Sequence, residues 1–266
     1  MNRAVLGIDA AWTSNQRSGI ALATEGSGQW HLVSVAPSYE RFMAPTTASE
    51  AAPADAKGSL PDPARLLQAA RSYCECPIDI VAVDIPLSHE PITGRRASDD
   101  AVSRAYGASW CATHTPSAVR PGVIANRLKD AFEGAGYPLA TQRLHEPALI
   151  EVYPHPALVE LAQAEKRLPY KVQKAAKYWP GRDAAERRTS LLGTWEKIVD
   201  LLDNEIAGTR AALGAPNLLN KTRDLKSWED MLDAIVCAWV GITALKGQAV
   251  PHGDDVSAIW IPSRRE

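Results

Sequence analysis

The sequence predicts a mixed α/β domain whose sheet begins with three antiparallel strands and continues with parallel ones. Three observations favour this fold. Short apolar or alternating runs occupy residues 4–8, 19–24 and 30–35, and a Gly-rich turn precedes the third, as in an antiparallel meander. Residues 78–87 are a nearly continuous run of Ile, Val and Ala, which is typical of a strand buried on both faces. Between these regions, residues 63–73 have the composition and spacing of a crossover helix.

The second half of the chain supplies the other elements. We expect a strand at 148–153, stopped by Pro154, and a further apolar run at 256–261 that forms an edge strand or a docked tail. Helices are predicted at 157–166, 184–207 and 227–246. The last is the clearest, because Ser227 can cap it and most positions in its second half are apolar.

Two segments lack a sustained period. Residues 44–61, rich in Ala, Pro, Thr and Ser, are expected to form a surface loop. Residues 89–144 are punctuated by Gly, Arg and Pro, and we interpret them as a long insertion between the fourth and fifth strands. We therefore predict a single domain over residues 1–266, with this insertion and a basic helical segment at about 157–226.

Length and composition bound the class of protein. The chain has 266 residues and a mass of 28.7 kDa, with 45% hydrophobic and 23% charged residues, so a disordered or fibrous chain is excluded. The longest apolar stretch, residues 234–245, is shorter than the ~20 residues of a membrane helix. Asp9 comes too early for a secretory signal. We expect a soluble, cytoplasmic protein.

Cysteine spacing and net charge exclude other classes. The four cysteines match no zinc-binding pattern, and reduced structural thiols are expected. The formal net charge is −2, so any nucleic-acid binding requires a local basic patch. The phosphate loop, the dinucleotide turn and the nucleophile elbow are all missing from the sequence, which argues against P-loop, Rossmann and α/β-hydrolase enzymes.

Three acidic residues stand at the ends of elements that ought to be buried. Asp9 ends the first strand, Asp84 ends the fourth, and Asp233 lies in the apolar C-terminal helix. Lys and Arg are absent from residues 4–15, from 78–92 and from 229–245. Because a buried carboxylate is costly without a partner, a divalent cation is the expected partner.

Carboxylate oxygens are hard ligands, so the expected ion is Mg²⁺ or Mn²⁺. Two such ions about 4 Å apart could activate water and stabilise a leaving oxygen. The chemistry that this cluster indicates is phosphodiester cleavage.

Four short motifs in order along the chain resemble the DUF429 family, which is described as predicted nucleases with a ribonuclease H fold. They are GIDAAW at residues 7–12, VDIP at 83–86, EVYP at 151–154 and DMLDAIVCAWVG at 230–241. The resemblance implies a ribonuclease H-like sheet with metal-binding acids on strand one, strand four and the last helix. This plan agrees with the strands and acids placed above.

The resemblance also implies roles for individual residues. Asp9 would bridge two metals, Asp84 would hold one, and Asp233 would complete the cluster. Asp230, one helical turn before Asp233, resembles the paired helix acids of Holliday-junction resolvases. Glu151 could act as a further ligand or base, and His155 could orient water or the scissile phosphate.

Each of these residues also has a purely structural interpretation. Asp9 could bond its own backbone in a turn after the strand, and Asp230 stands where a capping acid follows Ser227. Glu151 could occupy a surface position on its strand. His155, between two prolines, could simply be exposed in a turn.

A basic segment at residues 166–188 is interleaved with aromatic residues, and could track a phosphate backbone while the aromatics stack on bases. A solvated helix face is the competing interpretation. The insertion supplies further arginines. The basic residues are Lys166, Arg167, Lys171, Lys174, Lys177, Arg182, Arg187 and Arg188 in the segment, and Arg95, Arg96, Arg104, Arg120 and Arg127 in the insertion.

We therefore expect a phosphodiester hydrolase dependent on Mg²⁺ or Mn²⁺, most plausibly a nuclease acting on DNA or RNA. One alternative is an Mg-ATP-dependent phosphotransferase of the sugar kinase and actin-like superfamily. Such proteins normally have two domains with Gly-rich phosphate hairpins, for which this chain is short. The other alternative is a nucleic-acid-binding module without catalysis.

Overall fold

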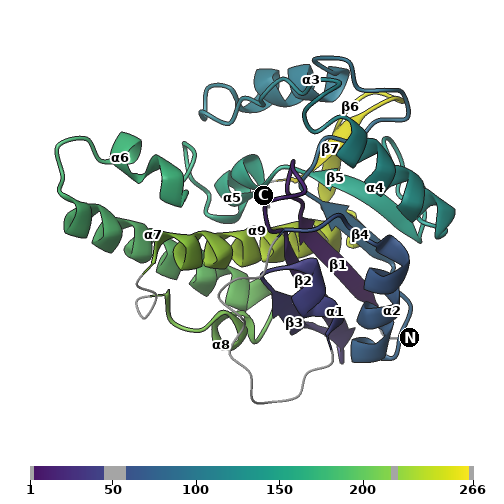
Figure 1. The fold of residues 1–266 in the computed structure, drawn as a ribbon, viewed down its shortest axis with the longest axis horizontal. Coiled ribbons are helices and arrows are strands. Elements are labelled where there is room, and N and C mark those ends of the chain that lie inside the picture. Colours follow the sequence, from purple (N-terminus) through teal and green to yellow (C-terminus); the bar gives the residue numbers. More distant parts are fainter. Residues whose placement is uncertain (1–2, 45–57, 217–220, 264–266) are drawn as a thin grey trace.

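One seven-stranded sheet, flanked by helices on both faces, organises the computed structural model, which describes residues 3–44, 58–216 and 221–263 (Figure 1). The strand order is β3-β2-β1-β4-β5-β7-β6. The strands are β1 (Ala4–Asp9), β2 (Gly19–Gly26), β3 (Gln29–Ala36), β4 (Ile80–Val83), β5 (Ala148–Val152), β6 (Ala249–Gly253) and β7 (Ala258–Pro262).

The predicted succession of strands is confirmed. β1, β2 and β3 pair antiparallel, with Asp9 opposite Gly19 in the β1–β2 register. β4 then lies parallel to β1, β5 parallel to β4, and β7 parallel to β5. The carboxyl ends of β1, β4 and β5 therefore meet at one edge of the sheet.

The helices agree with the prediction where the apolar period is strong. The expected helices at 63–73 and 184–207 are α2 and α7, and Asp183 and Glu186 form a capping box at the start of α7. The helix expected at 157–166 is α5. It begins earlier, because proline is well accommodated in a first helical turn, and it ends at Leu161, before the expected end. The helices of eight or more residues are α2 (Pro63–Cys74), α3 (Ala97–Tyr106), α4 (Val123–Gly134), α5 (Pro154–Leu161), α7 (Ala184–Glu205) and α9 (Thr222–Leu245).

Four short helices complete the described part of the chain. They are α1 (Tyr39–Met43), η1 (Val172–Lys174), α6 (Ala175–Tyr178) and α8 (Thr209–Leu213). The predicted insertion therefore contains real secondary structure: α3 packs against β6 and β7, and α4 packs against α2 and β5. Of the loop expected at 44–61, residues 45–57 lie outside the described ranges.

Two expectations at the C-terminal end are wrong. α9 begins at Thr222, so Ser227 is not its cap but lies inside the helix, where its hydroxyl accepts a hydrogen bond from Arg17 Nη1 at 3.1 Å. The apolar run at 256–261 forms β7, which is not an edge strand, because β6 pairs along its outer side. β6 contains Pro251 and Gly253, and each of its residues is half-buried or exposed, so its sequence carries little strand signal.

The sheet separates two hydrophobic cores. On one face, α9, α5 and α7 cover side chains such as Val5 and Ile80; on the other, α1, α2 and α4 cover Leu6 and Ile8. Within the described ranges, no helix combines the length and apolarity needed to span a membrane.

α9 lies directly on β1 and β2 because glycines open the space for it. A side-chain methyl at Gly7 would overlap the carbonyl oxygen of Ala234, and one at Gly19 would overlap that of Asp230. The helix backbone therefore touches the strands themselves, which fixes the position of every residue along α9.

We predict that Gly7→Ala lowers the free energy of unfolding by about 1–3 kcal/mol, because overpacking forces α9 and β1 apart. The new methyl would lie 2.5 Å from the Ala238 amide nitrogen, which cannot move independently of the helix. Urea unfolding followed by circular dichroism measures the effect.

Gly193→Ala in α7 is the matched control, because a methyl there meets no neighbouring atom. Its expected effect is a gain of up to about 1 kcal/mol from helix propensity. Equal unfolding curves for the two variants would contradict the tight packing of α9 on β1.

Candidate active site

Asp9 and Asp84 lie side by side at the carboxyl edge of the sheet. Ile8 is in register with Val83, and the Asp84 amide donates to the Ile8 carbonyl at 2.8 Å. Side chains alternate along a strand, and Val5 faces the core under α9, so Asp9 also points to the α9 side. The same alternation from Ile80 places Asp84 on that side, next to Asp9.

α9 carries further acidic residues over the same place. Its close approach to Gly19, the register partner of Asp9, sets Asp230 beside the end of β1. Asp9, Asp84, Glu229 and Asp230 line one cleft of about 670 Å³, while Asp233 is fully buried beneath it. The structure thus brings together the predicted acids Asp9, Asp84, Asp230 and Asp233, and adds Glu229, which the sequence analysis did not single out.

Two lysines that are not adjacent to these acids in sequence lie among them in the structure. Lys171 forms ion pairs with Asp233 and, at 3.5 Å, with Glu229. Lys226 pairs with Asp230 and, at 3.0 Å, with Glu229. The expectation that Asp9, Asp84 and Asp233 lack basic partners is therefore wrong for Asp233. The four-residue spacing from Lys226 to Asp230 on one helix face was the available signal.

Asp9 and Asp84 differ from the helix acids. Within the described ranges, no hydrogen bond or ion pair reaches either side chain. Burial raises the pKa of Asp9 well above its usual value, and the charges of Asp233 and Asp230 raise it further. Burial also raises the pKa of Asp84 to about 7, with Lys171 opposing this shift and Asp233 adding to it. The floor of the cleft consists of Asp9, Asp84, Glu229 and Asp230. The two positive charges of Lys171 and Lys226 are too few to balance the acids there.

The acids do not form a ready-made metal cage. In the part of the chain that the structure describes, no three or more His, Cys, Asp or Glu side chains are arranged to hold an ion. Asp233 is occupied by Lys171 and by Tyr170, whose hydroxyl donates to Oδ1 at 2.7 Å. Asp9 and Asp84 are the pair whose carboxylates remain open to the cleft.

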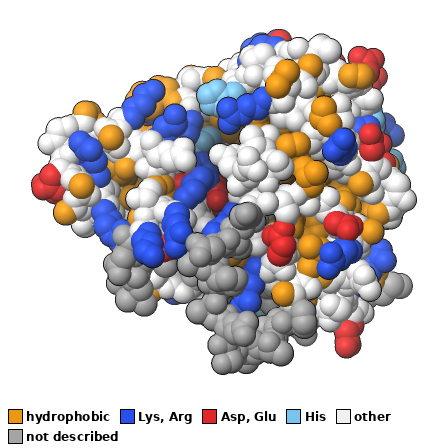
Figure 2. All heavy atoms as spheres, viewed as in Figure 1, with side chains coloured by type: hydrophobic (Ala, Val, Ile, Leu, Met, Phe, Trp, Pro, Cys, Tyr) orange, Lys and Arg blue, Asp and Glu red, His pale blue; other side chains and the backbone are white. Residues whose placement is uncertain are grey.

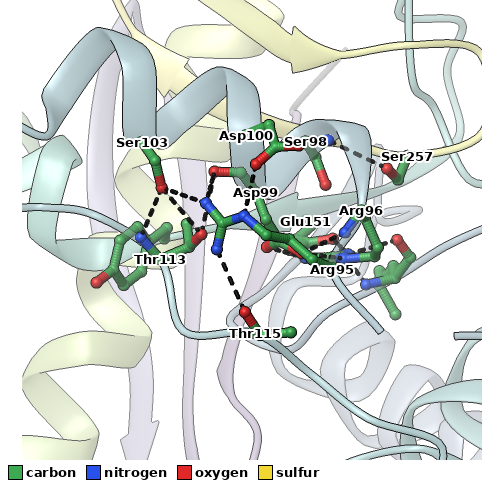
Figure 3. Close-up of polar contacts among 12 residues, drawn as sticks. Arg95, Arg96, Ser98, Asp99, Asp100, Ser103, Thr113, Thr115, Glu151 and Ser257 are labelled. Atoms are coloured by element: carbon green, nitrogen blue, oxygen red, sulfur yellow. Dashed lines mark hydrogen bonds and ion pairs between the residues drawn. The ribbon is translucent and has the colours of Figure 1, made fainter. Parts of the chain in front are cut away.

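Glu151 takes part in a different, buried network (Figure 3). Its two carboxylate oxygens accept from Arg96 at 2.6 and 2.8 Å, and one also accepts the Leu87 amide at 2.7 Å. Arg96 in turn binds Asp99 at 2.9 Å. Glu151 is 3% exposed, so the expected surface position is wrong, and it does not line the cleft. This network anchors the segment that follows Asp84.

His155 is buried in the first turn of α5 rather than exposed in a turn. Its ring packs edge-on against Tyr153 and Tyr170, with centroids 5.3 Å apart in each pair. Burial lowers its pKa well below the usual value, so the ring is neutral at pH 7. Its Nδ1 has no hydrogen-bond partner among the described residues, and the ring reaches the acids only through Tyr170.

Cations form the rim of the cleft. Figure 2 shows Lys and Arg side chains gathered around a hollow in which acidic side chains are visible. Among the residues that line the cleft, Arg167 and Lys174 come from the predicted basic segment, as does Lys171, and Arg120 comes from the insertion. The Arg120 guanidinium lies 5.8 Å from the ring centre of Trp12, which also lines the cleft.

Comparison with known proteins identifies the family. The family model named DUF429, described as a protein of unknown function, matches residues 7–258. The chain belongs to the DUF429 family. No curated protein and no solved structure gives a significant match. The region shared with DUF429 includes the strand acids Asp9 and Asp84 and the acids of α9.

We predict that Arg96→Met lowers the free energy of unfolding by about 3–5 kcal/mol, because it leaves two buried carboxylates without a counter-charge. Chemical unfolding at pH 7 measures the loss.

The neighbouring Arg95→Met is the control. Arg95 pairs with Asp100 at 2.5 Å, but at a surface position, where an ion pair contributes about 1 kcal/mol or less. Similar losses in the two variants would contradict the importance of the buried Glu151–Arg96 pair.

Proposed function

We propose that this protein is a divalent-metal-dependent phosphodiester hydrolase, a nuclease of the ribonuclease H-like kind. The observation that carries the proposal is the pair of carboxylates of Asp9 and Asp84, which are adjacent, have no hydrogen-bond or ion-pair partner among the described residues, and are open to a cleft with a cationic rim. Negative charge on the floor suits a metal ion, and positive charge on the rim suits the phosphates of a substrate.

The donor chemistry at the floor fits Mg²⁺ or Mn²⁺. Two carboxylates on neighbouring parallel strands, which lie ~4.8 Å apart, would hold the ion and leave positions for water and a phosphate oxygen. A bound ion would lower the pKa of water and neutralise charge on the phosphoryl group.

The lysines determine how the other acids contribute. Glu229, Asp230 and Asp233 hold Lys171 and Lys226 at the floor, so we assign these acids to positioning the two ammonium groups. An ammonium group there would stabilise the negative charge that develops on a phosphate during cleavage. Arg120, Arg167 and Lys174 on the rim would bind the neighbouring phosphates of the chain.

Glu151 and His155 act on this site from a distance in our proposal. The carboxylate of Glu151 is saturated by Arg96 and Leu87, so it positions the segment after Asp84 instead of serving as a ligand or base. The neutral ring of His155 supports Tyr170 and, through it, Asp233.

Asp9→Asn and Asp84→Asn are expected to reduce Mn²⁺-dependent cleavage of DNA and RNA by at least ~100-fold, because each removes a charged oxygen from the metal position. Titration calorimetry with Mn²⁺ reports binding independently of cleavage, and both variants should lose the uptake seen with the parent.

Asp200→Asn, an exposed change on α7, controls for loss of one negative charge and should behave as the parent. Unchanged cleavage in Asp9→Asn would contradict the proposal. Absence of Mn²⁺ uptake by the parent would favour the non-catalytic binding module, and ATP hydrolysis without phosphodiester cleavage would favour the phosphotransferase.

Asp84 makes a pH-dependent contribution to stability that Asp84→Asn should remove. Since burial raises the pKa of Asp84 to about 7 in the folded state, the folded protein holds a proton that the unfolded chain releases. This contribution is complete below about pH 4 and is lost as pH rises to about 7. In EDTA, we expect the variant to match the parent at low pH and to be more stable above pH 7, as measured by urea unfolding across pH. A constant difference at all pH values would contradict the assigned pKa shift.

A further inference from the structure

Trp110 is a large aromatic side chain presented to solvent by a constrained turn. It lies after α3 and is 66% exposed. Its backbone φ is +61°, a left-handed conformation that is unfavourable for a bulky residue. The turn is fixed by hydrogen bonds from the Trp110 amide to Gly107 and from the Cys111 amide to Tyr106, both at 3.0 Å. A strained backbone conformation that holds a large side chain in solvent, where it gains nothing from burial, indicates a functional role for that side chain.

The turn that carries Trp110 is attached to the rim of the cleft. The Arg167 amide donates to the Ser109 carbonyl at 2.8 Å, and the side chain of Arg167 lines the cleft. Lys166 Nζ lies 4.6 Å from the centre of the Trp110 ring. Four residues beyond Trp110, His114 lines the cleft as well. The cation that lies over the indole is therefore adjacent in sequence to the rim residue Arg167, and the segment of Trp110 itself reaches the cleft at His114.

The rim contains a second pairing of the same kind, in which Arg120 lies over Trp12. Each indole therefore has a cation beside it. A cation next to an aromatic ring can bind a phosphate while the ring stacks on the attached base. An apolar partner would gain little from a ring with the Lys166 ammonium group over it, whereas a polyanion with aromatic bases satisfies both the ring and the cation.

We propose that Trp110 stacks on an unpaired base of single-stranded nucleic acid whose backbone enters the cleft at Arg167. This inference rests on the proposed function and specifies its substrate. Bases in a duplex are already stacked inside it, so the indole can contribute only where bases are unpaired. DNA and RNA share the aromatic base and the phosphate, and both satisfy the geometry.

The test measures binding without catalysis, by fluorescence anisotropy in EDTA, using the full chain. The probes are a short single-stranded DNA, the single-stranded RNA of the same sequence, and the corresponding DNA duplex. Trp110→Ala should weaken binding of at least one of the single strands by ~5- to 100-fold, which corresponds to the loss of one stacked base. Trp110→Tyr should retain most of the affinity, and binding of the duplex should be unchanged.

Val250→Ala, another exposed apolar position but on the edge strand β6, is the matched control and should bind as the parent does. Parental affinity of Trp110→Ala for both single strands overturns the inference. So does equal weakening for duplex and single strand, or failure of the parent to bind either single strand.

Cleavage of a small aryl phosphodiester in Mn²⁺ separates this inference from the proposed function. Trp110 does not line the cleft, and such a substrate has no chain of nucleotides to extend beyond it, so Trp110→Ala should hydrolyse it at the parental rate. If Trp110→Ala weakens single-strand binding but the parent does not hydrolyse the aryl phosphodiester, the binding surface is supported and the hydrolase is refuted. If the parent hydrolyses it but Trp110→Ala binds single strands as the parent does, the hydrolase is supported and the role of Trp110 is refuted.

Discussion

The contact of α9 with β1 and β2 is the constraint on which the rest of the structure depends. Gly7 and Gly19 have no side chain between strand and helix, so the helix backbone lies against the sheet. At that distance, Asp230 and Asp233 come to the carboxyl edge, where Asp9 and Asp84 already stand on adjacent parallel strands. A larger residue at either glycine would separate the two sources of acidic side chains.

The contact of α9 with the sheet concentrates acidic side chains at one place. Their charge is accommodated differently on the helix and on the strands. Lys171 and Lys226 neutralise the helix acids through direct ion pairs. The strand acids receive no such partner among the described residues, and their raised pKa values reflect that cost. Sites that bind cations are commonly unfavourable when empty, since the groups that attract the ion repel one another without it.

Sequence reasoning succeeded where a local pattern has one physical cause. Continuous apolar runs predicted β1 and β4, and an apolar stripe at helical spacing predicted α7. The parallel arrangement of β1 and β4 explains why Asp9 and Asp84 could be placed together. It failed where the deciding contact is distant in the chain. Lys171 reaches Asp233 only after the chain has folded, and Arg96 meets Glu151 in the same way. The exposure of Trp110 could not be predicted from the sequence either, because exposure depends on whether other segments of the folded chain pack over the side chain.

The pair formed by Arg96 and Glu151 has a consequence for the insertion between β4 and β5. The insertion carries the arginine, and the central sheet carries the glutamate, so each would have an uncompensated charge without the other. A shortened chain without this insertion would therefore not be a simpler functional domain. The insertion and the end of β5 are therefore linked, because removal of the segment that carries Arg96 would leave the buried carboxylate of Glu151 without its counter-charge.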